Sequence, residues 1–461
     1  MSTAGESAGA ARGPVNTLSV GSVVAYAFPT VGVSLIAYLL NLYFFKYATD
    51  VLLIAPAAMG LIFGDARIWD AVSDPMAGFL SDRTESRLGR RRPWLYASAL
   101  PMAVVPLLLW NPPALLDGLM LIAWTTVAIL LYETAITVWF VPHSALGAEL
   151  SMAHHERTRV FAYRQFAWYL GFLLCVGALH LLTTSEDRRA TALLISLVAG
   201  GGAGLLILLG TGRVRERLEH VGRGARNPIK AVKDVLVNRY ARLLILVFLI
   251  ENIGTASLGI LAPYFMQYIM HEESAYSLLL LSHFIPTILI IPAAVWLSRR
   301  FGKKTVWFIA MLFSAGAYVG KFFAGPGELV YLLTVTMATG IGTGIGTVVG
   351  PSVQADVVDF DEYETGERKE GSYFAIWNFI RKGAAGLVAA LTGILLQWAG
   401  FEPNVAQSEG TLMTIRVLYT VLPAVMLSLG ALVFLFRFDL TEAAHARVRA
   451  RLDAREAAAS G

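Results

Sequence analysis

The sequence predicts an all-α membrane protein with twelve membrane-spanning helices in two bundles of six. The 461 residues are 56 % hydrophobic and only 15 % charged, whereas soluble domains carry about 25 % charged residues. The charges are unevenly spread, so stretches long enough to cross a bilayer, about 20 residues, carry almost none. Basic residues gather in alternate loops between these stretches, and one loop motif recurs six predicted helices later.

The composition also excludes several classes of protein and site. Cys175 is the single cysteine, which excludes a disulfide framework and a Cys-based zinc or iron–sulfur site. The eight His residues are scattered without metal-ligand spacing, and the net charge of +4 is small. A soluble enzyme, a disordered protein and a disulfide scaffold are all incompatible with this composition.

Hydropathy places the spans in order along the chain, six before a polar stretch and six after it. The first six lie near residues 22–46, 54–81, 93–110, 118–141, 160–182 and 190–211, and the second six near 241–269, 276–297, 304–324, 328–350, 372–400 and 412–437. We expect 17–212 to form the N-terminal bundle and 241–438 the C-terminal bundle. We expect a disordered tail at 1–16, a linker at 213–240 and a C-terminal tail at 439–461.

The loops predict the orientation. Arg and Lys are concentrated after spans 2, 4, 6 and 8, whereas the loops after spans 1, 3, 7, 9 and 11 contain neither. Cytoplasmic loops carry the excess of basic residues, so both tails and the linker are expected in the cytoplasm. The strict alternation with apolar spans favours this interpretation over nucleic-acid binding. The Ala-, Gly- and Arg-rich composition favours a bacterial inner membrane.

A repeated hairpin motif indicates internal duplication. Leu80–Arg83 with Leu88–Arg91 follows span 2, and Leu297–Lys304 follows span 8. Duplicated six-helix halves are typical of transporters whose binding site lies between two bundles at the middle of the membrane. The spacing from Gly78 to Arg83, followed by Gly89–Arg91, resembles the loop signature of the major facilitator superfamily and implies that fold.

Span 2 carries charges that a lipid-facing helix would not tolerate. Arg67, Asp70 and Asp74 fall on one helical face, and each central carboxylate facing lipid would cost roughly 2.5–3.5 kcal/mol. With Ser73 nearby and Pro75 freeing a backbone carbonyl, the two acids predict a monovalent-cation site. The alternative is an internal salt-bridge cluster around Arg67 without ion traffic, although one Arg cannot neutralise both acids.

Other spans contain isolated polar residues at depth. Glu133 and Thr137 lie one turn apart in span 4, and Lys382 lies too deep in span 11 for its amine to reach the membrane surface. We expect functional roles for Glu133 and Lys382. For Glu251 in span 7 and His283 in span 8, a functional role and a simple helix contact are equally compatible with the sequence.

Several motifs give a specific resemblance. They are Ala66–Ala71 with Ser73–Pro75, Tyr47–Val51, Arg92–Trp94, Asp356–Phe360, Arg381–Gly383 and Pro403–Gln407. Together they resemble the glycoside–pentoside–hexuronide:cation symporter family over about residues 18–440. The resemblance implies that Asp70, Asp74 and Thr137 bind Na⁺, Li⁺ or H⁺, with Lys382 beside them.

The sugar-binding positions of the melibiose-permease branch match less well. Ser34, Phe140 and Ser144 stand where that branch has two acids and a Trp, while Arg164 is retained. We therefore expect weak or absent binding of simple galactosides, and a different glycoside, a uronate or a lysophospholipid as solute. The predicted solute-binding residues are Ser34, Asn41, Glu133, Phe140, Ser144, Arg164, Trp377, Asn378 and Lys382.

The resulting hypothesis is a monomeric symporter that needs no cofactor beyond a coupling Na⁺ or H⁺. A sugar or glycoside would move with the cation by alternating access, and ion pairs among cytoplasmic charges would close the inner side. The predicted coupling and gating residues are Arg67, Asp82, Arg83, Asp356, Asp359 and Arg368. The alternatives are a cation-coupled lysophospholipid symporter and a non-transporting sensor or lipid-binding protein. An intramembrane aspartyl protease fits poorly, because Asp70 and Asp74 share one helix.

Overall fold

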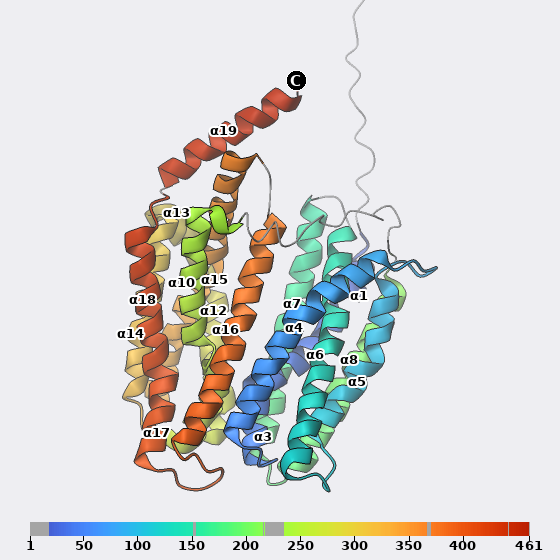
Figure 1. Cartoon of the computed structure of the whole chain (residues 1–461), viewed down its shortest axis with the longest axis vertical. Helices are drawn as coiled ribbons and strands as arrows, with labels where there is room; N and C mark the ends of the chain where they lie inside the picture. Colours follow the sequence, from blue (N-terminus) through green and yellow to red (C-terminus); the bar gives the residue numbers. More distant parts are fainter. Residues whose placement is uncertain are drawn as a thin grey trace, which may run out of the picture.

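The computed structural model describes residues 18–150, 154–214, 216, 235–366, 370–440 and 442–460, which form helices joined by loops and contain no strand. Figure 1 shows two groups of long helices side by side, with the helices up to α8 in one group and those from α10 to α18 in the other. We call these groups the N-terminal half and the C-terminal half.

The N-terminal half contains the first six expected spans. The first of them is built from four consecutive segments, and each of the others is one continuous helix. These elements are α1 (Val20–Ala27), α2 (Pro29–Leu39), η1 (Leu40–Phe44), α3 (Phe45–Asp50), α4 (Pro56–Arg83), α5 (Arg92–Trp110), α6 (Gly118–Glu149), α7 (His154–Thr184) and α8 (Arg188–Arg213).

The C-terminal half contains the other six and ends in an additional helix. The elements are α10 (Arg239–Thr255), α11 (Leu258–Tyr264), η3 (Phe265–Ile269), η4 (Glu273–Ala275), α12 (Tyr276–Leu289), α13 (Ile291–Phe301), α14 (Lys303–Phe322), α15 (Leu329–Thr365), α16 (Glu370–Trp398), α17 (Glu409–Arg416), η5 (Val417–Val421), α18 (Leu422–Arg437) and α19 (Glu442–Ser460).

The described part is an integral, multi-pass membrane protein. Ten helical segments are long and apolar enough to cross a membrane, and the pair Glu273–Leu289 and Ile291–Phe301, bent by 48°, adds an eleventh. The remaining expected span is α4, which is 28 residues long but carries Asp65, Arg67, Asp70 and Asp74 in its middle. Its charges, and not its length, distinguish α4 from the other spans.

Helices extend beyond their apolar cores on one side of the molecule. We call the side that carries α19 and the end of α4 the terminal face, and the side that carries α17 and the α3–α4 junction the opposite face (Figure 1). On the terminal face α15 continues to Thr365, well past the end of its predicted span near residue 350. The sequence 442–460, expected as a tail, forms α19, which packs on the end of α15.

Spans 1 and 7 have the same irregularity in the two halves. Each contains one π-helical turn, Leu40–Phe44 in the first and Phe265–Ile269 in the second. These segments lie near the opposite face, where η1 contacts α11 of the other half. π-Turns are rare and are often found at functional positions; a third one, Val417–Val421, lies in span 12, whereas α8, the matching span 6, is a single α-helix.

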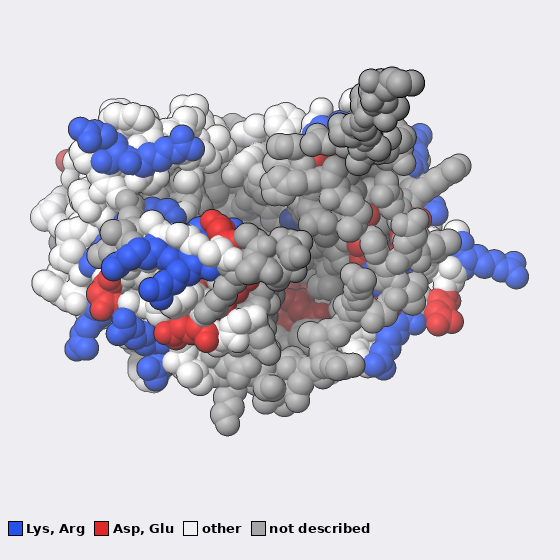
Figure 2. Space-filling view, turned by 90° about the horizontal axis from the view of Figure 1, so that it is seen from above, with Lys and Arg blue, Asp and Glu red and all other residues white. Residues whose placement is uncertain are grey.

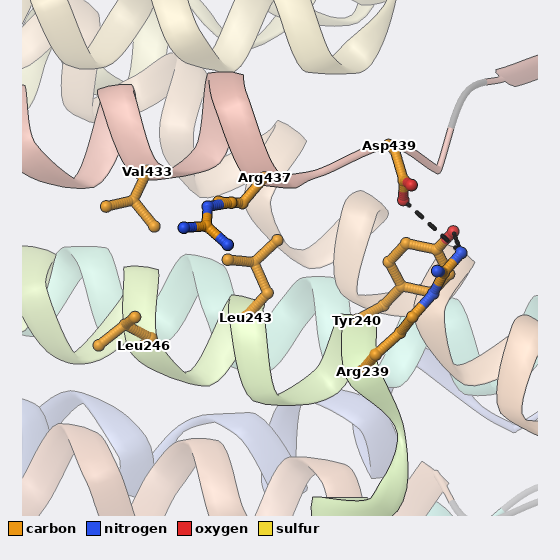
Figure 3. Close-up of a pocket in the computed structure, with 7 residues that line it drawn as sticks. All are labelled: Arg239, Tyr240, Leu243, Leu246, Val433, Arg437 and Asp439. Carbon is orange, nitrogen blue, oxygen red and sulfur yellow. Dashed lines mark hydrogen bonds and ion pairs between the residues drawn. The ribbon is translucent and has the colours of Figure 1, made fainter.

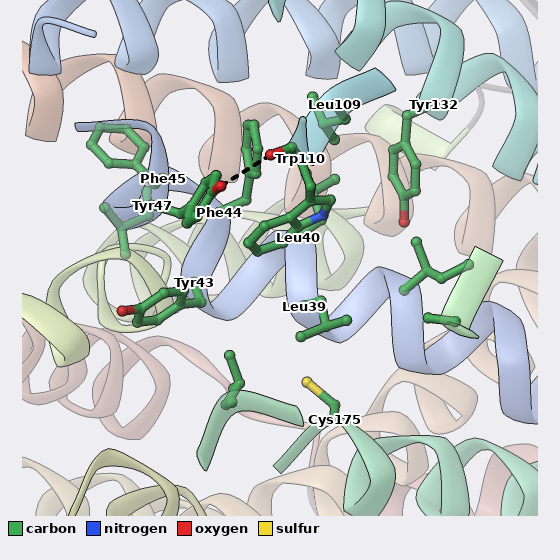
Figure 4. Close-up of a cluster of buried hydrophobic side chains, with 14 of the residues drawn as sticks. Leu39, Leu40, Tyr43, Phe44, Phe45, Tyr47, Leu109, Trp110, Tyr132 and Cys175 are labelled. Atoms are coloured by element: carbon green, nitrogen blue, oxygen red, sulfur yellow. Dashed lines mark hydrogen bonds between the residues drawn. The ribbon is translucent and has the colours of Figure 1, made fainter. Parts of the chain in front are cut away.

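The apolar core is continuous between the halves near the opposite face. One buried cluster includes Leu39, Phe44 and Trp110 of the N-terminal half together with Tyr264 and Phe265 of the other. Figure 4 shows the N-terminal part of this cluster, in which the Tyr47 hydroxyl donates to the Trp110 carbonyl at 3.1 Å. A second cluster near the terminal face contains residues of the C-terminal half alone, in the described part of the chain. The halves are therefore packed together mainly at the opposite face.

Helices α4 and α16 pack more closely than any other pair and bring the two halves together. A side chain at Gly60 would lie 2.7 Å from the Ala389 carbonyl oxygen, and one at Gly393 would lie 2.2 Å from the Pro56 carbonyl oxygen. Because these residues lack a Cβ, the two backbones can approach. This approach places the charged segment of α4 against α16.

Candidate functional site

A network of charged residues, buried at Asp70 and Glu133 and partly exposed at Asp74, forms at the junction of α4, α6 and α16. The Arg67 guanidinium donates to Asp70 Oδ2 at 2.9 Å and to Glu133 Oε1 at 3.0 Å. Asp70 is 1 % exposed and Glu133 is 3 % exposed, whereas Asp65 on the other face of α4 is exposed. Arg67, Asp70 and Asp74 therefore lie on one face of α4, as the sequence predicts.

Lys382 connects α16 to the two acids. Its Nζ lies 2.5 Å from Asp74 Oδ2 and 3.3 Å from Asp70 Oδ2. Thr137 of α6 donates to the other Asp74 oxygen at 2.8 Å. The structure therefore brings together Asp70, Asp74, Thr137 and Lys382, which come from distant parts of the sequence and from both halves.

The ion pairs of the network join three carboxylates to two cations. Asp70, Asp74 and Glu133 share Arg67 and Lys382 in these pairs, and Arg381 lies close enough to Asp70 and Asp74 to interact electrostatically with both. Among the described residues, Asp70 Oδ1 and the buried Ser73 hydroxyl have no hydrogen-bond partner. Buried polar atoms are usually paired, so these two oxygens are available to a ligand. Together with Asp74 and Thr137 they form a set of hard oxygen donors that suits an alkali cation or a proton.

Arg164 and its predicted neighbours form a second region, on α6 and α7. Arg164 donates to the Ser144 hydroxyl at 3.0 Å, and its guanidinium lies 5.8 Å from the centre of the Phe140 ring. Phe140 is exposed, and its ring is 6.5 Å from Trp168, which donates to the Tyr38 hydroxyl. Three of the predicted solute-binding residues thus lie together beside an aromatic surface.

Other predicted solute-binding residues are placed differently. Ser34 is fully buried and donates to the Val31 carbonyl, while the Asn41 amide donates to the Ala37 carbonyl of its own helix. Glu133 accepts from Arg67 in the charged network. Ser34 and Asn41 thus bond to their own helix, and Glu133 belongs with the cation site.

Trp377 and Asn378 line a cavity inside the C-terminal half. It has a volume of about 460 Å³ and is bounded by α10, α14, α15, α16 and α18. Glu251, which had two equally compatible interpretations from the sequence, also lines this cavity. A slightly larger pocket, about 490 Å³, lies between α10 and α18 near Arg239 and Arg437 (Figure 3). That pocket contains none of the predicted site residues.

The predicted gating residues pair within their own halves. Asp82 accepts from Arg91, and the Arg83 guanidinium lies 3.9 Å from the centre of the Phe79 ring. In the C-terminal half Lys303 donates to Asp356 at 2.7 Å, and His445 of α19 lies 3.1 Å from Asp359. Arg368 lies outside the described residues. Figure 2 views the terminal face, on which Lys and Arg side chains are spread with Asp and Glu side chains among them.

The opposite face holds a charged cluster that was not predicted from the sequence. Lys46 is 0 % exposed, bonds to Asp50 and to Gln267 of the C-terminal half, and lies 3.6 Å from Glu273. Arg188 donates to Glu273 at 2.6 Å. We call Lys46, Asp50, Arg188, Gln267 and Glu273 the opposite-face cluster.

Aromatic hydroxyls complete the cluster. Tyr43 donates to Glu273 at 3.0 Å, and Tyr268 donates to Asp50 at 3.0 Å. Lys46 and Asp50 stand one helical turn apart at the end of an apolar span, which was the available sequence signal. The partners across the halves carried no such signal.

The family follows from a comparison of the whole sequence with protein-family models. The model of the MFS/sugar transport protein family matches residues 25–442. The chain belongs to this family. The match covers both halves and includes α4, α6 and α16, so the charged network lies within the family's common architecture.

Curated relatives include symporters and importers of different solutes. The chain is 27 % identical to the isoprimeverose transporter of Lactiplantibacillus pentosus, over 86 % of this chain and 84 % of the relative. It is 26 % identical to a putative sulfoquinovose importer of Escherichia coli, over 92 % of each chain. It is 25 % identical to the sodium-dependent lysophosphatidylcholine symporter 1 of Xenopus tropicalis, over 92 % of this chain and 88 % of the relative.

Solved structures agree on the fold. The crystal structure of the nucleoside transporter NupG superposes with a TM-score of 0.67 and 11 % identity, covering 91 % of this chain and all of the other. At this identity the likeness is one of fold alone. The major facilitator fold implied by the loop motif after span 2 is confirmed.

Proposed function

We propose that this protein is a secondary active symporter that couples the movement of a glycoside-type solute to a monovalent cation, Na⁺ or H⁺. The observation that carries the proposal is the set of oxygen atoms at the α4–α16 junction, where Asp70 Oδ1 and the Ser73 hydroxyl have no hydrogen-bond partner among the described residues and Asp74 is held by Thr137 and Lys382. Buried polar atoms inside a membrane are costly unless they are paired. A cation that enters and leaves with the solute would pair with these oxygens.

The proposed cation site is formed by Asp70, Ser73, Asp74 and Thr137. Lys382 is a competitor of the cation, because its amine contacts both aspartates. When a cation binds, Lys382 would move away from Asp74 and the contact between α4 and α16 would change. Binding at this position is therefore linked to the relative position of the two halves, and such linkage between two ligands is typically about 1–3 kcal/mol.

Uptake into proteoliposomes with imposed Na⁺ or proton gradients tests this proposal. Uptake by the wild-type protein should depend on one of these gradients, and Asp74→Asn should abolish the dependence. Asp65→Asn is the matched control, because Asp65 lies on the same helix but is exposed. If Asp74→Asn keeps the wild-type cation dependence, the salt-bridge interpretation of Arg67 is correct and the site is wrong.

A lysophospholipid is the second candidate solute. It is favoured by the position of Arg164 beside Phe140 and by the aromatic contacts that continue from Phe140 to Trp168 and Tyr38. A guanidinium next to an apolar surface suits a ligand with a phosphate head and an acyl tail. Competition of lysophosphatidylcholine with sugar uptake, compared between wild type and Arg164→Ala, distinguishes the two candidates.

We propose that the terminal face is cytoplasmic and that the membrane is a bacterial inner membrane. The support is the concentration of Arg and Lys in the loops of that face. Cysteines introduced at His220 and Leu115 in a Cys175→Ala background test the orientation. Labelling from outside intact cells should modify position 115 alone, and modification at 220 instead would reverse the assignment.

A further inference from the structure

The cavity inside the C-terminal half is lined by polar groups that have no hydrogen-bond partner among the described residues. It lies between α10, α14, α15, α16 and α18, and its lining does not include Arg67, Asp70, Asp74, Glu133 or Lys382. Its volume of about 460 Å³ falls within the range of small-molecule binding sites, about 300–1,000 Å³. Three of its lining side chains carry an unpaired polar group.

These side chains are Glu251 of α10, Trp307 of α14 and Gln354 of α15. Within the described parts of the chain, no hydrogen bond or ion pair involves the Glu251 carboxylate, the Gln354 amide or the Trp307 indole N–H. Polar groups inside a membrane protein are costly unless they are paired. A ligand that accepts from Trp307 and Gln354 and donates to Glu251 would satisfy all three.

Aromatic rings provide the flat surfaces of the same cavity. Trp307, Tyr318 and Trp377 line it, and all three are at most 4 % exposed. Gly346 and Gly350 of α15 face Trp307, since a side chain at these positions would lie 3.9 Å and 3.5 Å from its indole ring. The two glycines therefore keep space open beside the indole ring.

We propose that this cavity binds the sugar ring of a neutral glycoside, with Glu251 accepting hydrogen bonds from its hydroxyl groups. The inference rests on the proposed symport function and specifies its solute. Trp307 and Gln354 donate to ring or hydroxyl oxygens, and the aromatic faces contact the apolar C–H side of the ring. Among the described residues that line the cavity there is no Lys, Arg or His, so a sulfonate or carboxylate would find no cation beside Glu251, and the cavity selects neutral sugars over anionic ones.

The chemistry of the three groups makes this selection stringent. A ligand without a hydroxyl at the Glu251 position would leave a desolvated carboxyl group unpaired, and sites built in this way reject such ligands strongly. Replacing Glu251 by Gln retains the shape but puts an amide group in place of one carboxyl oxygen. A buried hydrogen-bonding group left without a matching partner is costly enough for Glu251→Gln to weaken sugar binding about 10- to 100-fold.

Calorimetry on the purified full-length protein tests the proposal with two probes, isoprimeverose as a neutral sugar and sulfoquinovose as an anionic one. We expect wild-type protein to bind isoprimeverose more tightly than sulfoquinovose, and Glu251→Gln to reduce or invert that preference. Glu328→Gln is the matched control, because Glu328 is an exposed acid at the start of α15 outside the cavity.

A second pair of variants tests the volume of the cavity independently of its charge. Gly346→Leu places a side chain beside Trp307 and should abolish sugar binding. Gly316→Leu, on α14, faces open space and should have no effect. Thermal unfolding of both variants checks that the protein remains folded.

Three results would overturn the proposal. The first is that Glu251→Gln and Gly346→Leu both bind isoprimeverose as tightly as the wild-type protein does. The second is that the wild-type protein binds sulfoquinovose more tightly than isoprimeverose. The third is that the wild-type protein binds neither sugar. A change in cation or pH dependence without a change in sugar affinity would equally reject it, because Glu251 would then act in coupling. Sugar binding that requires Glu251 but ignores the cation would instead contradict the proposed symport and leave the cavity assignment intact.

Discussion

The two faces of the molecule use their charged residues in different ways. On the opposite face, Lys46 and Arg188 of the N-terminal half contact Gln267 and Glu273 of the C-terminal half. On the terminal face, the ion pairs between described residues stay within one half, as for Arg91 with Asp82 and Lys303 with Asp356. The structure is therefore closed at the opposite face, and its halves are less connected at the terminal face.

Burial makes this difference energetically important. The Lys46 and Asp50 side chains are 0 % and 1 % exposed, so breaking their pairs would leave charges in a medium of low polarity. Removing one partner of a buried ion pair typically costs about 3–5 kcal/mol, whereas exposed pairs contribute about 0–1 kcal/mol. The opposite-face cluster is thus the stronger connection between the halves, and its two acids and two cations balance one another.

The largest expected effect comes from Lys46→Met. The substitution leaves Asp50 and Glu273 without their shared cation. It should raise the population of molecules whose halves are separated at the opposite face about 100-fold, relative to molecules that are closed there. Spin labels at Leu115 and Val405, two exposed positions on that face in different halves, would report a longer distance.

Lys321→Met is the matched control for this variant. Lys321 is also buried, 2 % exposed, but it contacts Tyr318 and Tyr419 of its own half. It should therefore leave the distance between the labels unchanged. An equal lengthening in both variants would show that any buried lysine has this effect and would remove the special role of the opposite-face cluster.

A smaller effect is expected from Arg188→Gln. Arg188 is 24 % exposed and contributes one ion pair, with Glu273, which keeps its contacts to Lys46 and Tyr43. We expect the population of molecules that are open at the opposite face to rise about 3- to 10-fold, measured with the same labels. A shift as large as that of Lys46→Met would mean that burial does not determine the strength of these pairs.

The smallest effect is expected from Asp356→Asn on the terminal face. Its pair with Lys303 lies within the C-terminal half and is partly exposed, so the opposite-face distance should be unchanged. The same measurement checks this expectation. A clear lengthening would show that Asp356 influences the closure of the opposite face, contrary to the difference between the two faces.

The spans and the grouping of charges on one face of α4 could be predicted from the sequence for identifiable reasons. Apolar stretches of fixed length and alternating basic loops define the helices, and the spacing of Arg67, Asp70 and Asp74 fixes them on one face of α4 whatever the packing. Thr137 and Lys382 came from the family resemblance. Their contacts with Asp74 require α4, α6 and α16 to meet, which spacing along the chain cannot predict.

The remaining features depend on contacts between distant helices. Lys46 stands at the end of an apolar span, and only the partners from η3 and η4 show that it joins the halves. Ser34 was expected near the solute, yet it is packed against Gly171, whose missing side chain would lie 1.8 Å from the Ser34 hydroxyl. Asp82, Asp356 and Asp359 remain predicted to pair across the halves in a conformation closed at the terminal face.

We infer that the two faces open alternately, with the opposite-face cluster holding the present conformation. A second distance in Lys46→Met, between spin labels at Leu88 and Phe301 on the terminal face, tests this inference, because the two positions lie in different halves and are exposed. We expect this distance to shorten as the opposite-face distance lengthens. A terminal-face distance that stays at its wild-type value while the opposite face opens would contradict it.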